Sequence, residues 1–490
     1  MFKLSENIDP NKIFIINHSE LEGRFDPIFY ASDLAKFNTN IFKSVLLKSI
    51  VKYFKSGFGA GKQEQTDAKN GIIQIRPTNI DENGFLKYDK NIYLPIDKNS
   101  IRIEVDDILF NNTNSQELVG KTAILKENKE LTFSNHITII RVRKEAILPD
   151  YLWIILNMYQ RNRIFYSICT NWNNQSGIGL ELLKKLKIPL PPLEIQQQIV
   201  DLYEKAYTEK QQKETEAQKL LDSIDDYLLG ELGITLPKEE EHLPQNTDKN
   251  NSYNLDNDNP LVKKGRLFLT NLSEVTGKRI DSDYYSIYYK KIIWCIEGSY
   301  YKTETIGKYC GFISGYAFSS NDYIGQSDCI LITIKNISKN IITLEEKTFL
   351  PSQYYEMYPK FRVLENDLLI AMTGATIGKV GIYNSCEKSL LNQRNGIIRS
   401  KNLNTFYLMN LLNLDIYQKL ILRSSVGGAQ PNISGKEILK INIPIPSLQK
   451  QNEIATHISQ IRNKANALKQ EGKGILEQAK QEVEQMIFGN

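Results

Sequence analysis

Residues 188–199 read IPLPPLEIQQQI, and residues 443–454 read IPIPSLQKQNEI. These stretches begin at Ile188 and Ile443, which lie 443 − 188 = 255 positions apart. Arg24-Phe25-Asp26 and Arg279-Ile280-Asp281 are separated by the same distance, so the repeat extends over a whole unit. Each proline-rich copy precedes a long polar segment with helical periodicity. The sequence therefore predicts two globular parts, each followed by a long helix. Two similar but non-identical surfaces suit an extended ligand better than a single enzyme pocket does.

The two long helices share one pattern of apolar residues. A four-then-three spacing is typical of helices that pack together along a seam. In the second helix the seam comprises Ile454, Ile458, Ile461, Ala465, Leu468, Gly472, Ile475, Ala479, Glu482 and Met486. In the first helix it comprises Ile199, Tyr203, Ala206, Lys210, Lys213, Ala217, Leu220, Ile224 and Tyr227. Because a helix with one apolar stripe is unstable alone, we predict that the two helices pair antiparallel. The alternative is that each packs on its own globular part.

The globular parts contain both strand and helix patterns. Residues 71–76 and 136–142 are β-rich, residues 150–169 have helical spacing, and residues 396–399 and 405–412 repeat these patterns in the second half. We predict an α+β fold with two mixed α/β domains, an antiparallel coiled coil and a pseudo-two-fold internal repeat. The predicted boundaries are residues 1–193 for the first domain, 194–233 for the first long helix, 234–260 for a flexible linker, 261–448 for the second domain and 449–490 for the second long helix.

Composition excludes several classes of protein. The 490 residues are 41% hydrophobic, which is sufficient for two ordinary cores. No apolar run approaches the roughly 20 residues that span a bilayer, and the first residues do not resemble a signal peptide, so we expect a cytoplasmic protein. Five cysteines without CxxC spacing and four scattered histidines predict neither disulfides nor a metal site. The net charge of +4 permits nucleic-acid binding through local patches without requiring it.

Several motifs identify a resemblance. Residues 313–318 (ISGYAF), 366–379 (NDLLIAMTGATIGK) and 427–434 (GGAQPNIS) lie in the second half, and residues 107–115 (DILFNNTNS) and 117–121 (ELVGK) lie in the first. Together with the proline-rich stretch before each helix, these segments resemble the DNA specificity subunits of type I restriction-modification enzymes. The resemblance covers nearly the whole chain except the linker.

The resemblance implies a function and a set of partners. The two globular domains would be target recognition domains, each reading one half of a bipartite, asymmetric double-stranded DNA target. The helices would set the unread spacer and would dock two methyltransferase subunits, and restriction subunits would join the complex. The chain itself would be non-catalytic and would hold no cofactor, whereas S-adenosylmethionine, ATP and Mg would be bound by the partner subunits.

Polar side chains in loops are the expected DNA contacts. Asn and Gln can read adenine, Arg can read guanine, and Lys can hold phosphates. The candidates in the first domain are Lys55, Lys62, Arg76, Asn79, Asn112, Asn114 and Lys121. The candidates in the second domain are Lys335, Asn336, Thr373, Lys379, Arg394, Arg423, Gln430 and Asn432. Since LNQR at residues 391–394 stands where the first half has FSNH at residues 133–136, a role for Arg394 does not transfer, and we expect different half-sites.

Two alternatives remain open from the residues alone. Gly57–Gly61 and Asp26–Phe29 loosely resemble the cofactor and catalytic motifs of a self-contained DNA methyltransferase. However, the second motif lacks a proline, and the two lie too close together to frame a nucleotide-binding fold. We therefore interpret Gly57–Gly61 as a flexible loop that can approach a phosphate closely. A coiled-coil scaffold without DNA binding is the other alternative. We assign no catalytic residue and no metal ligand.

Overall fold

The computed structural model describes residues 15, 41–95, 102–173, 175–236, 283–285, 287–424 and 432–489. The chain divides into two compact units, which are treated separately below. Unit 1 comprises residues 1–214 and 468–490, and unit 2 comprises residues 215–467. Several predictions fall outside the described residues: the repeat at 24–26 and 279–281, the motif at 26–29, the linker after residue 236, and Gln430.

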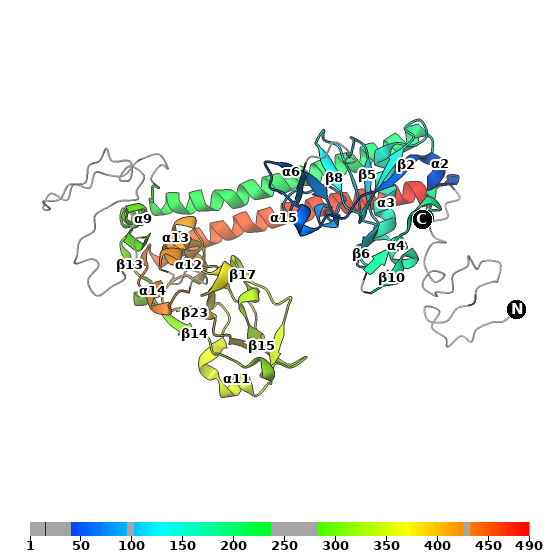
Figure 1. The fold of residues 1–490 in the computed structure, drawn as a ribbon. Helices are drawn as coiled ribbons and strands as arrows, with labels where there is room; N and C mark the ends of the chain where they lie inside the picture. The colour runs from blue at the N-terminus through cyan, green and yellow to red at the C-terminus, as the bar shows by residue number, and fades with distance from the viewer. Residues whose placement is uncertain are drawn as a thin grey trace. The chain divides into compact units, whose positions relative to one another are not determined.

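Unit 1 is built on a four-stranded antiparallel sheet of order β2-β9-β5-β7 (Figure 1). Its strands are β2 (Val51–Ser56), β9 (Ile137–Val142), β5 (Ile108–Asn111) and β7 (Thr122–Ile124). A second sheet contains β4 (Tyr93–Pro95), β3 (Gly71–Ile75) and β8 (Leu131–Phe133), with β3 and β8 parallel. Strand β1 (Ser44–Leu46) pairs with β12 (Lys187–Pro189), and β10 (Thr170–Trp172), β11 (Gln175–Gly177) and β6 (Thr113–Asn114) form a small third sheet. The helices are α2 (Leu47–Ile50), α3 (Pro149–Arg161), α4 (Ile164–Ile168) and α5 (Leu180–Lys184).

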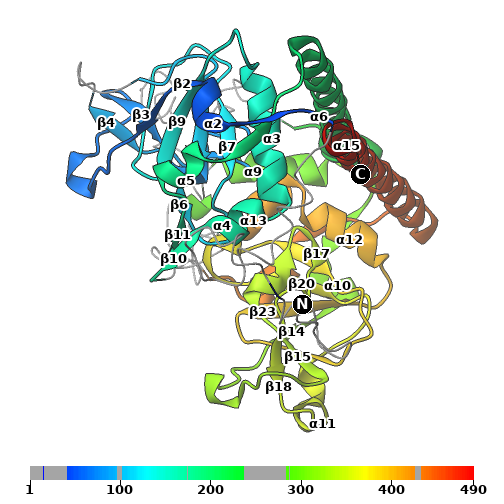
Figure 2. The same cartoon turned by 90° about the vertical axis from the view of Figure 1, so that its right-hand side faces the viewer.

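Unit 2 repeats this plan with additional strands (Figure 2). Its main sheet has the order β14 (Cys310–Ser314), β23 (Asn395–Ser400), β20 (Leu368–Ala371), β21 (Val380–Ile382), β17 (Asn340–Ile342) and β16 (Ile337–Ser338). A second sheet contains β18 (Thr348–Leu350), β15 (Cys329–Ile332), β22 (Ser389–Leu391) and β19 (Arg362–Val363), and β13 (Thr303–Thr305) pairs with β24 (Asn442–Pro444). The helices are α9 (Ile287–Glu297), α10 (Ile306–Tyr309), α11 (Tyr354–Met357), α12 (Thr405–Leu412), α13 (Asp415–Arg423) and α14 (Gly435–Leu439). The predicted α+β fold with an internal repeat is confirmed.

A buried ion pair recurs at the same place in both main sheets. In unit 1 the Arg141 guanidinium donates to the Asp107 carboxylate at 2.6 and 2.7 Å. In unit 2 Arg399 donates to Asp367 at 2.7 and 2.6 Å. The hydrogen bonds to Asp107 raise the pKa of Arg141. Because both carboxylates are almost completely buried, the pair fixes the register of neighbouring strands and tolerates loss of one partner poorly.

The proline-rich stretches are held by two repeated hydrogen bonds. In unit 1 the Tyr151 hydroxyl donates to the carbonyl of Pro189 (2.9 Å), and the Gln196 amide donates to the carbonyl of Pro191 (2.9 Å). In unit 2 the Tyr407 hydroxyl donates to the carbonyl of Pro444, and the Gln451 amide donates to the carbonyl of Pro446. Proline has no N–H, so its stretch cannot join a sheet on both sides, and these carbonyls obtain side-chain partners instead. The stretch thereby fixes the direction in which α6 leaves β12 and α15 leaves β24.

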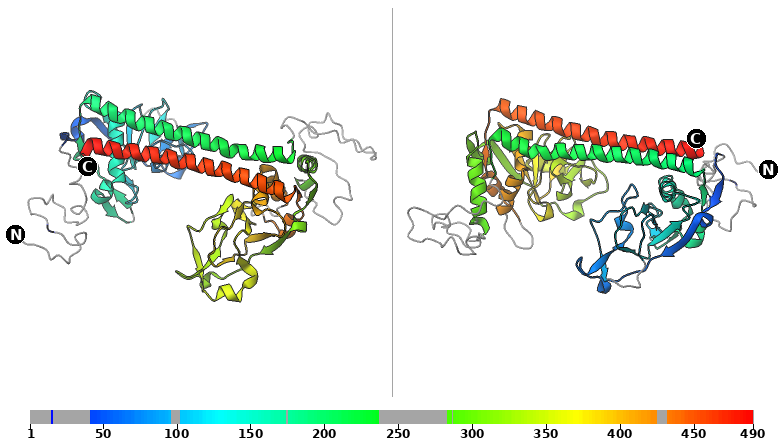
Figure 3. Two further views of the ribbon diagram at one scale, coloured as in Figure 1. Left: turned by 180° about the vertical axis from the view of Figure 1, so that it is seen from behind. Right: turned by 90° about the horizontal axis from the view of Figure 1, so that it is seen from above.

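The two long helices are α6 (Leu193–Leu232) and α15 (Leu448–Phe488), and they run antiparallel (Figure 3). In unit 1 Lys213 forms an ion pair with Glu471 (2.8 Å). In unit 2 the Tyr227 ring lies 4.3 Å from the His457 ring. As residue numbers rise along α6 they fall along α15, which confirms the predicted antiparallel pairing. Each unit therefore contains the beginning of one long helix and the end of the other.

The buried seam drifts from the predicted heptad at the end of each helix. In α6 Leu228 is fully buried (0% exposed), whereas the predicted Tyr227 is only partly buried. In α15 Val483 is 1% exposed, whereas the predicted Glu482 is exposed. Tyr227 is half-buried and still contacts His457 of α15, whereas the prediction for Glu482 was wrong; a straight helix has 3.6 residues per turn and drifts by about 20° per heptad. The drift occurs at equivalent positions of the two repeats.

Candidate nucleic-acid interface

In unit 1 three connections meet at one end of the main sheet. The segment after β2 approaches the β8–β9 connection, because Gly57 N–H donates to the carbonyl of Ile137 (3.2 Å). The β5–β6 connection joins them, since Asn112 N–H donates to the carbonyl of His136 (3.0 Å) and the Asn112 amide donates to the carbonyl of Asn135 (3.2 Å). Strand β3 also ends here, beside Ser134. We call this surface loop edge 1: residues 57–62, 76–79, 112–121 and 134–136, with the hairpin β10-β11.

Unit 2 brings the equivalent segments together. Gly315 N–H donates to the carbonyl of Asn395 (3.0 Å), and Met372 N–H donates to the carbonyl of Arg394 (2.9 Å). Thr373 pairs with Asn432 as Thr113 pairs with Gly177 in unit 1. We call this surface loop edge 2: residues 315–316, 333–336, 372–379 and 392–394, with Asn432.

Glycines shape the same turns in both edges. A Cβ on Gly57 would collide with the carbonyl oxygen of Phe133, and one on Gly315 would collide with that of Asn392. Gly120 and Gly378 both have positive φ (88° and 85°), which favours glycine, and each precedes a lysine. Gly57 is therefore tied into the end of the sheet, which corrects the expectation that Gly57–Gly61 as a whole is a flexible loop. The two edges share one backbone framework.

Loop edge 1 presents amides, lysines and aromatic rings. Asn112 is held in one orientation, because its amide nitrogen also donates to the Thr138 hydroxyl (2.8 Å), and Asn114 lies beside it in β6. Lys62 is exposed and Lys121 is half-buried, and Lys55 is exposed on the adjoining β2. The sequence analysis missed two exposed aromatic residues, Phe58 (42% exposed) and Trp172 (46% exposed). The NWNN turn at residues 171–174 was the available hairpin signal for Trp172.

Loop edge 2 presents different side chains on the same framework. Arg394 and Lys379 are exposed, Thr373 is half-buried, and Asn432 is exposed. Lys335 is 77% exposed and lies 3.8 Å from Glu346, a separation that gives a weak surface pair. Tyr316, at the position of Phe58, is 40% exposed.

Four of the predicted contact residues are committed to the scaffold. Asn79 and Asn336 are 0% and 2% exposed, and each caps a turn by accepting from the backbone N–H three residues earlier and donating to nearby carbonyls. Arg423 donates to the carbonyl of Tyr284 (2.6 Å) and lies over its ring. Arg76 is half-buried and donates to the carbonyl of Lys90 (3.3 Å). We leave these four residues out of the proposed interface.

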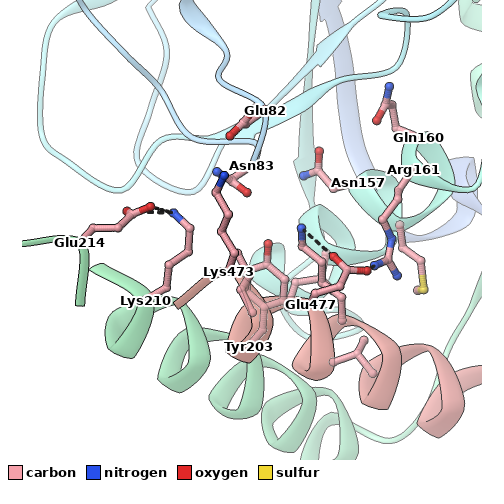
Figure 4. Close-up of a pocket in the computed structure, with 15 residues that line it drawn as sticks. Glu82, Asn83, Asn157, Gln160, Arg161, Tyr203, Lys210, Glu214, Lys473 and Glu477 are labelled. Carbon is pink, nitrogen blue, oxygen red and sulfur yellow. Dashed lines mark hydrogen bonds and ion pairs between the residues drawn. The ribbon is translucent and has the colours of Figure 1, made fainter. Parts of the chain in front are cut away.

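A cavity of about 530 Å³ lies elsewhere in unit 1, between α3, the turn at Glu82 and both long helices (Figure 4). Arg161 of α3 binds Glu477 and Glu484 of α15 at 2.7 and 2.8 Å. Lys480 lies 3.7 Å from Glu477, and burial lowers the pKa of Lys480, with Arg161 adding to this effect. Because its cations and carboxylates are largely matched, the cavity wall acts as a clamp between α3 and α15 rather than as a ligand site.

Searches for other kinds of site gave no candidate in the described part of the chain. None of its helices is both long and apolar enough to cross a membrane. Its histidines, cysteines and carboxylates form no group of three or more that could hold a metal ion.

Comparisons with known proteins give one family. The family model described as type I restriction modification DNA specificity domain matches residues 31–220 and again residues 299–478. The chain is 24% identical over 405 residues to the type I restriction enzyme MjaVIII specificity subunit of Methanocaldococcus jannaschii, covering 81% of each chain. It is 41% identical over 102 residues to the putative type I restriction enzyme MjaX specificity subunit of the same organism, covering 21% of this chain and 24% of that protein. A chain from a study of complex assembly and conformational transition of the type I R-M system has a similar fold, with a TM-score of 0.50, 16% identity, and coverage of 92% of this chain and 98% of that chain.

Proposed function

The chain belongs to the type I restriction modification DNA specificity family, and on that premise we propose that loop edges 1 and 2 each read one half of a bipartite DNA target. Members of this family are non-catalytic DNA-recognition subunits, so this chain recognises DNA and leaves the chemistry to its partners. The proposed contacts are Lys55, Lys62, Asn112, Asn114 and Lys121 in unit 1. In unit 2 they are Lys335, Thr373, Lys379, Arg394 and Asn432, with Gln430 as an expectation from the sequence.

One observation carries this proposal: the two loop edges share a framework but differ in their exposed side chains. Glycines and backbone hydrogen bonds recur at equivalent positions, whereas the side chains differ: one edge has the exposed Asn135 and the half-buried His136, and the other has the exposed Gln393 and Arg394. Sequence is read by hydrogen bonds to base edges, and phosphate contacts carry no sequence information. Different donors on one framework therefore predict different half-sites, and hence an asymmetric target. Lys121 and Lys379 occupy equivalent positions and suit the common task of holding phosphate.

The partners follow from the family, and their placement is part of the proposal. We assign the partners as two methyltransferase subunits, joined by restriction subunits, which supply S-adenosylmethionine, ATP and Mg. The starts of the long helices support two equivalent docking sites. Leu193 and Leu448 begin α6 and α15, occupy equivalent positions, and are 41% and 55% exposed. Two copies of one partner would meet the same residue type at the start of each helix.

The antiparallel helices are the proposed spacer. A helix rises by 1.5 Å per residue, so 40 residues extend for about 60 Å. A paired helix is stiff over that length, and the two half-sites would therefore be separated by a fixed number of unread base pairs.

The decisive experiment compares the chain alone with the chain plus its methyltransferase partner. DNA with a randomised sequence is incubated with S-adenosylmethionine and each preparation, and methylated adenines are mapped. We expect no methylation by the chain alone, and methylation within one bipartite asymmetric sequence by the complex. Methylation by the chain alone would favour the self-contained enzyme. If the complex did not bind DNA, the scaffold alternative would gain support, whereas salt-dependent binding would exclude it, because phosphate contacts make affinity fall with salt.

A further inference from the structure

The two loop edges carry different side chains at one equivalent pair of residues, the half-buried His136 in unit 1 and the exposed Arg394 in unit 2. The backbone places them identically: Asn112 N–H donates to the carbonyl of His136 (3.0 Å), and Met372 N–H donates to the carbonyl of Arg394 (2.9 Å). Each lies in the connection that leads into the second strand of its main sheet, β9 in unit 1 and β23 in unit 2. A position with a fixed backbone and a changed side chain is where two half-sites can be distinguished.

The backbone at Arg394 is rigid. The next residue, Asn395, is 0% exposed, and its amide donates to the carbonyl of Ile332 (3.3 Å) while its backbone N–H donates to the carbonyl of Asn392 (3.1 Å). Strand β23 begins at Asn395 and pairs with both neighbours from there onward. The Arg394 side chain therefore starts from a fixed point at the end of the sheet.

The side chain itself has no structural task in the described residues. Arg394 is exposed, and it has no ion-pair partner within the described ranges. By contrast, the other arginines of the main sheets, Arg141 and Arg399, are bound to buried carboxylates. Within the described residues the Arg394 guanidinium of loop edge 2 therefore makes no hydrogen bond or ion pair that would compete with a ligand.

A guanidinium matches one base in particular. Guanine presents two acceptors in the major groove, O6 and N7, and the arginine fork binds both at once. Lysine ammonium groups are point charges that suit phosphate, and loop edge 2 has Lys335 and Lys379 for that purpose. We propose that Arg394 reads a guanine in the half-site of unit 2, and that residues 136 and 394 are the equivalent specificity-determining positions of the two repeats. The inference rests on the proposed function and adds the base class and the residue.

The test uses the full chain assembled with its methyltransferase partner and a double-stranded DNA library randomised at both half-sites. Arg394→Ala and Arg394→Lys are compared with the wild type. Lys401→Ala is the matched control, because Lys401 is also exposed but follows the opposite end of β23. We expect Arg394→Ala to reduce discrimination at one G·C pair of the unit 2 half-site by about 5- to 150-fold, with Lys401→Ala unchanged. Replacing that guanine by 7-deazaguanine should weaken wild-type binding, because it removes the N7 acceptor.

A reciprocal variant tests the equivalence of the two positions. In His136→Arg we expect a new preference for guanine at one base pair of the unit 1 half-site, with the unit 2 half-site unchanged. Far-UV circular dichroism confirms that each variant is folded.

Two results would overturn the inference. Uniformly weaker binding to all sequences in Arg394→Ala, with the logarithmic salt slope smaller by about one, would identify a phosphate contact instead. Unchanged discrimination in Arg394→Ala would mean that Arg394 does not face DNA. If the wild-type complex showed no bipartite preference at all, the proposed function would fail first, and the inference would fall with it. That outcome is recognised before any variant is made.

Discussion

The drift of the helix seam gives the sharpest prediction for stability. The heptad pattern assigns Glu482 to the interface, whereas the buried residue is its neighbour Val483, which is 1% exposed and packs in the core of unit 1. Val483→Ala removes two buried methyl groups, each worth about 0.8 kcal/mol in transfer, and leaves a small cavity. We therefore expect a loss of about 2 kcal/mol in the free energy of unfolding.

The neighbouring residue is the matched control. Glu482 is exposed, so Glu482→Ala should change the free energy of unfolding by at most about 0.5 kcal/mol. Urea denaturation followed by far-UV circular dichroism measures both variants. With a slope of about 2 kcal/mol per molar urea, Val483→Ala should lower the midpoint by about 1 M, and Glu482→Ala should leave it nearly unchanged.

The equivalent residue of the first helix provides an independent check in unit 2. Leu228 is fully buried among Ile224, Leu232, Ile454 and Ile458. Leu228→Ala should cost about 2–5 kcal/mol. The reasoning would be refuted if Glu482→Ala destabilised the protein more than Val483→Ala did, because the strict heptad would then describe the interface better than the drifted seam.

Three further predictions concern charge and length. Asp107→Ala removes a buried partner of Arg141 and should destabilise unit 1 by about 3–5 kcal/mol, whereas Asp328→Ala breaks an exposed pair and should cost less than about 1 kcal/mol; equal losses in urea denaturation would contradict this. Burial lowers the pKa of Lys480. Between that lowered pKa and the ordinary lysine value of about 10.4, the unfolded chain binds a proton that the folded chain has released. The free energy of unfolding of the wild type therefore has a component that rises with pH in this window. Lys480→Met should lack that component, and identical pH slopes of the urea midpoint would argue against it. Inserting seven residues into the middle of both long helices keeps the seam in phase and adds about 10 Å, so the methylated target should gain about three unread base pairs; an active complex with its original spacer would contradict the spacer proposal.

The fold was largely predictable because the sequence contains an internal repeat. The repeat at residues 188–199 and 443–454 marked the end of each globular part, and α6 and α15 begin at Leu193 and Leu448. The proline carbonyls explain why this stretch is so constant between the repeats: each accepts from a tyrosine or a glutamine side chain. These carbonyls need side-chain donors, so the tyrosine and the glutamine occur in both halves of the sequence together with the prolines.

The surface positions of the candidate contact residues were less predictable than the fold, because one residue type serves two purposes. Asn79 and Asn112 both lie in polar loops, yet Asn79 is buried and closes a turn, whereas Asn112 is half-buried in loop edge 1. Asparagine is frequent in turns because its side chain imitates a backbone group. The residue type does not state whether an amide points inward, since that depends on the partner it meets in the fold: Asn79 donates to the carbonyl of Lys87, and Asn112 donates to that of Asn135.

Comparison of the two repeats distinguishes structural residues from candidate DNA-contact residues better than residue type does. Polar groups that recur and are buried, such as Asp107 with Arg141 and Asp367 with Arg399, hold the sheet and cannot change singly without leaving an unpaired buried charge. Exposed residues on the loop edges bear no such constraint. His136 and Arg394 differ although their backbone hydrogen bonds are the same. Under the proposed function, a half-site would change through the loop edge alone, while the sheets, the proline-rich stretches and the proposed helical spacer stayed as they are.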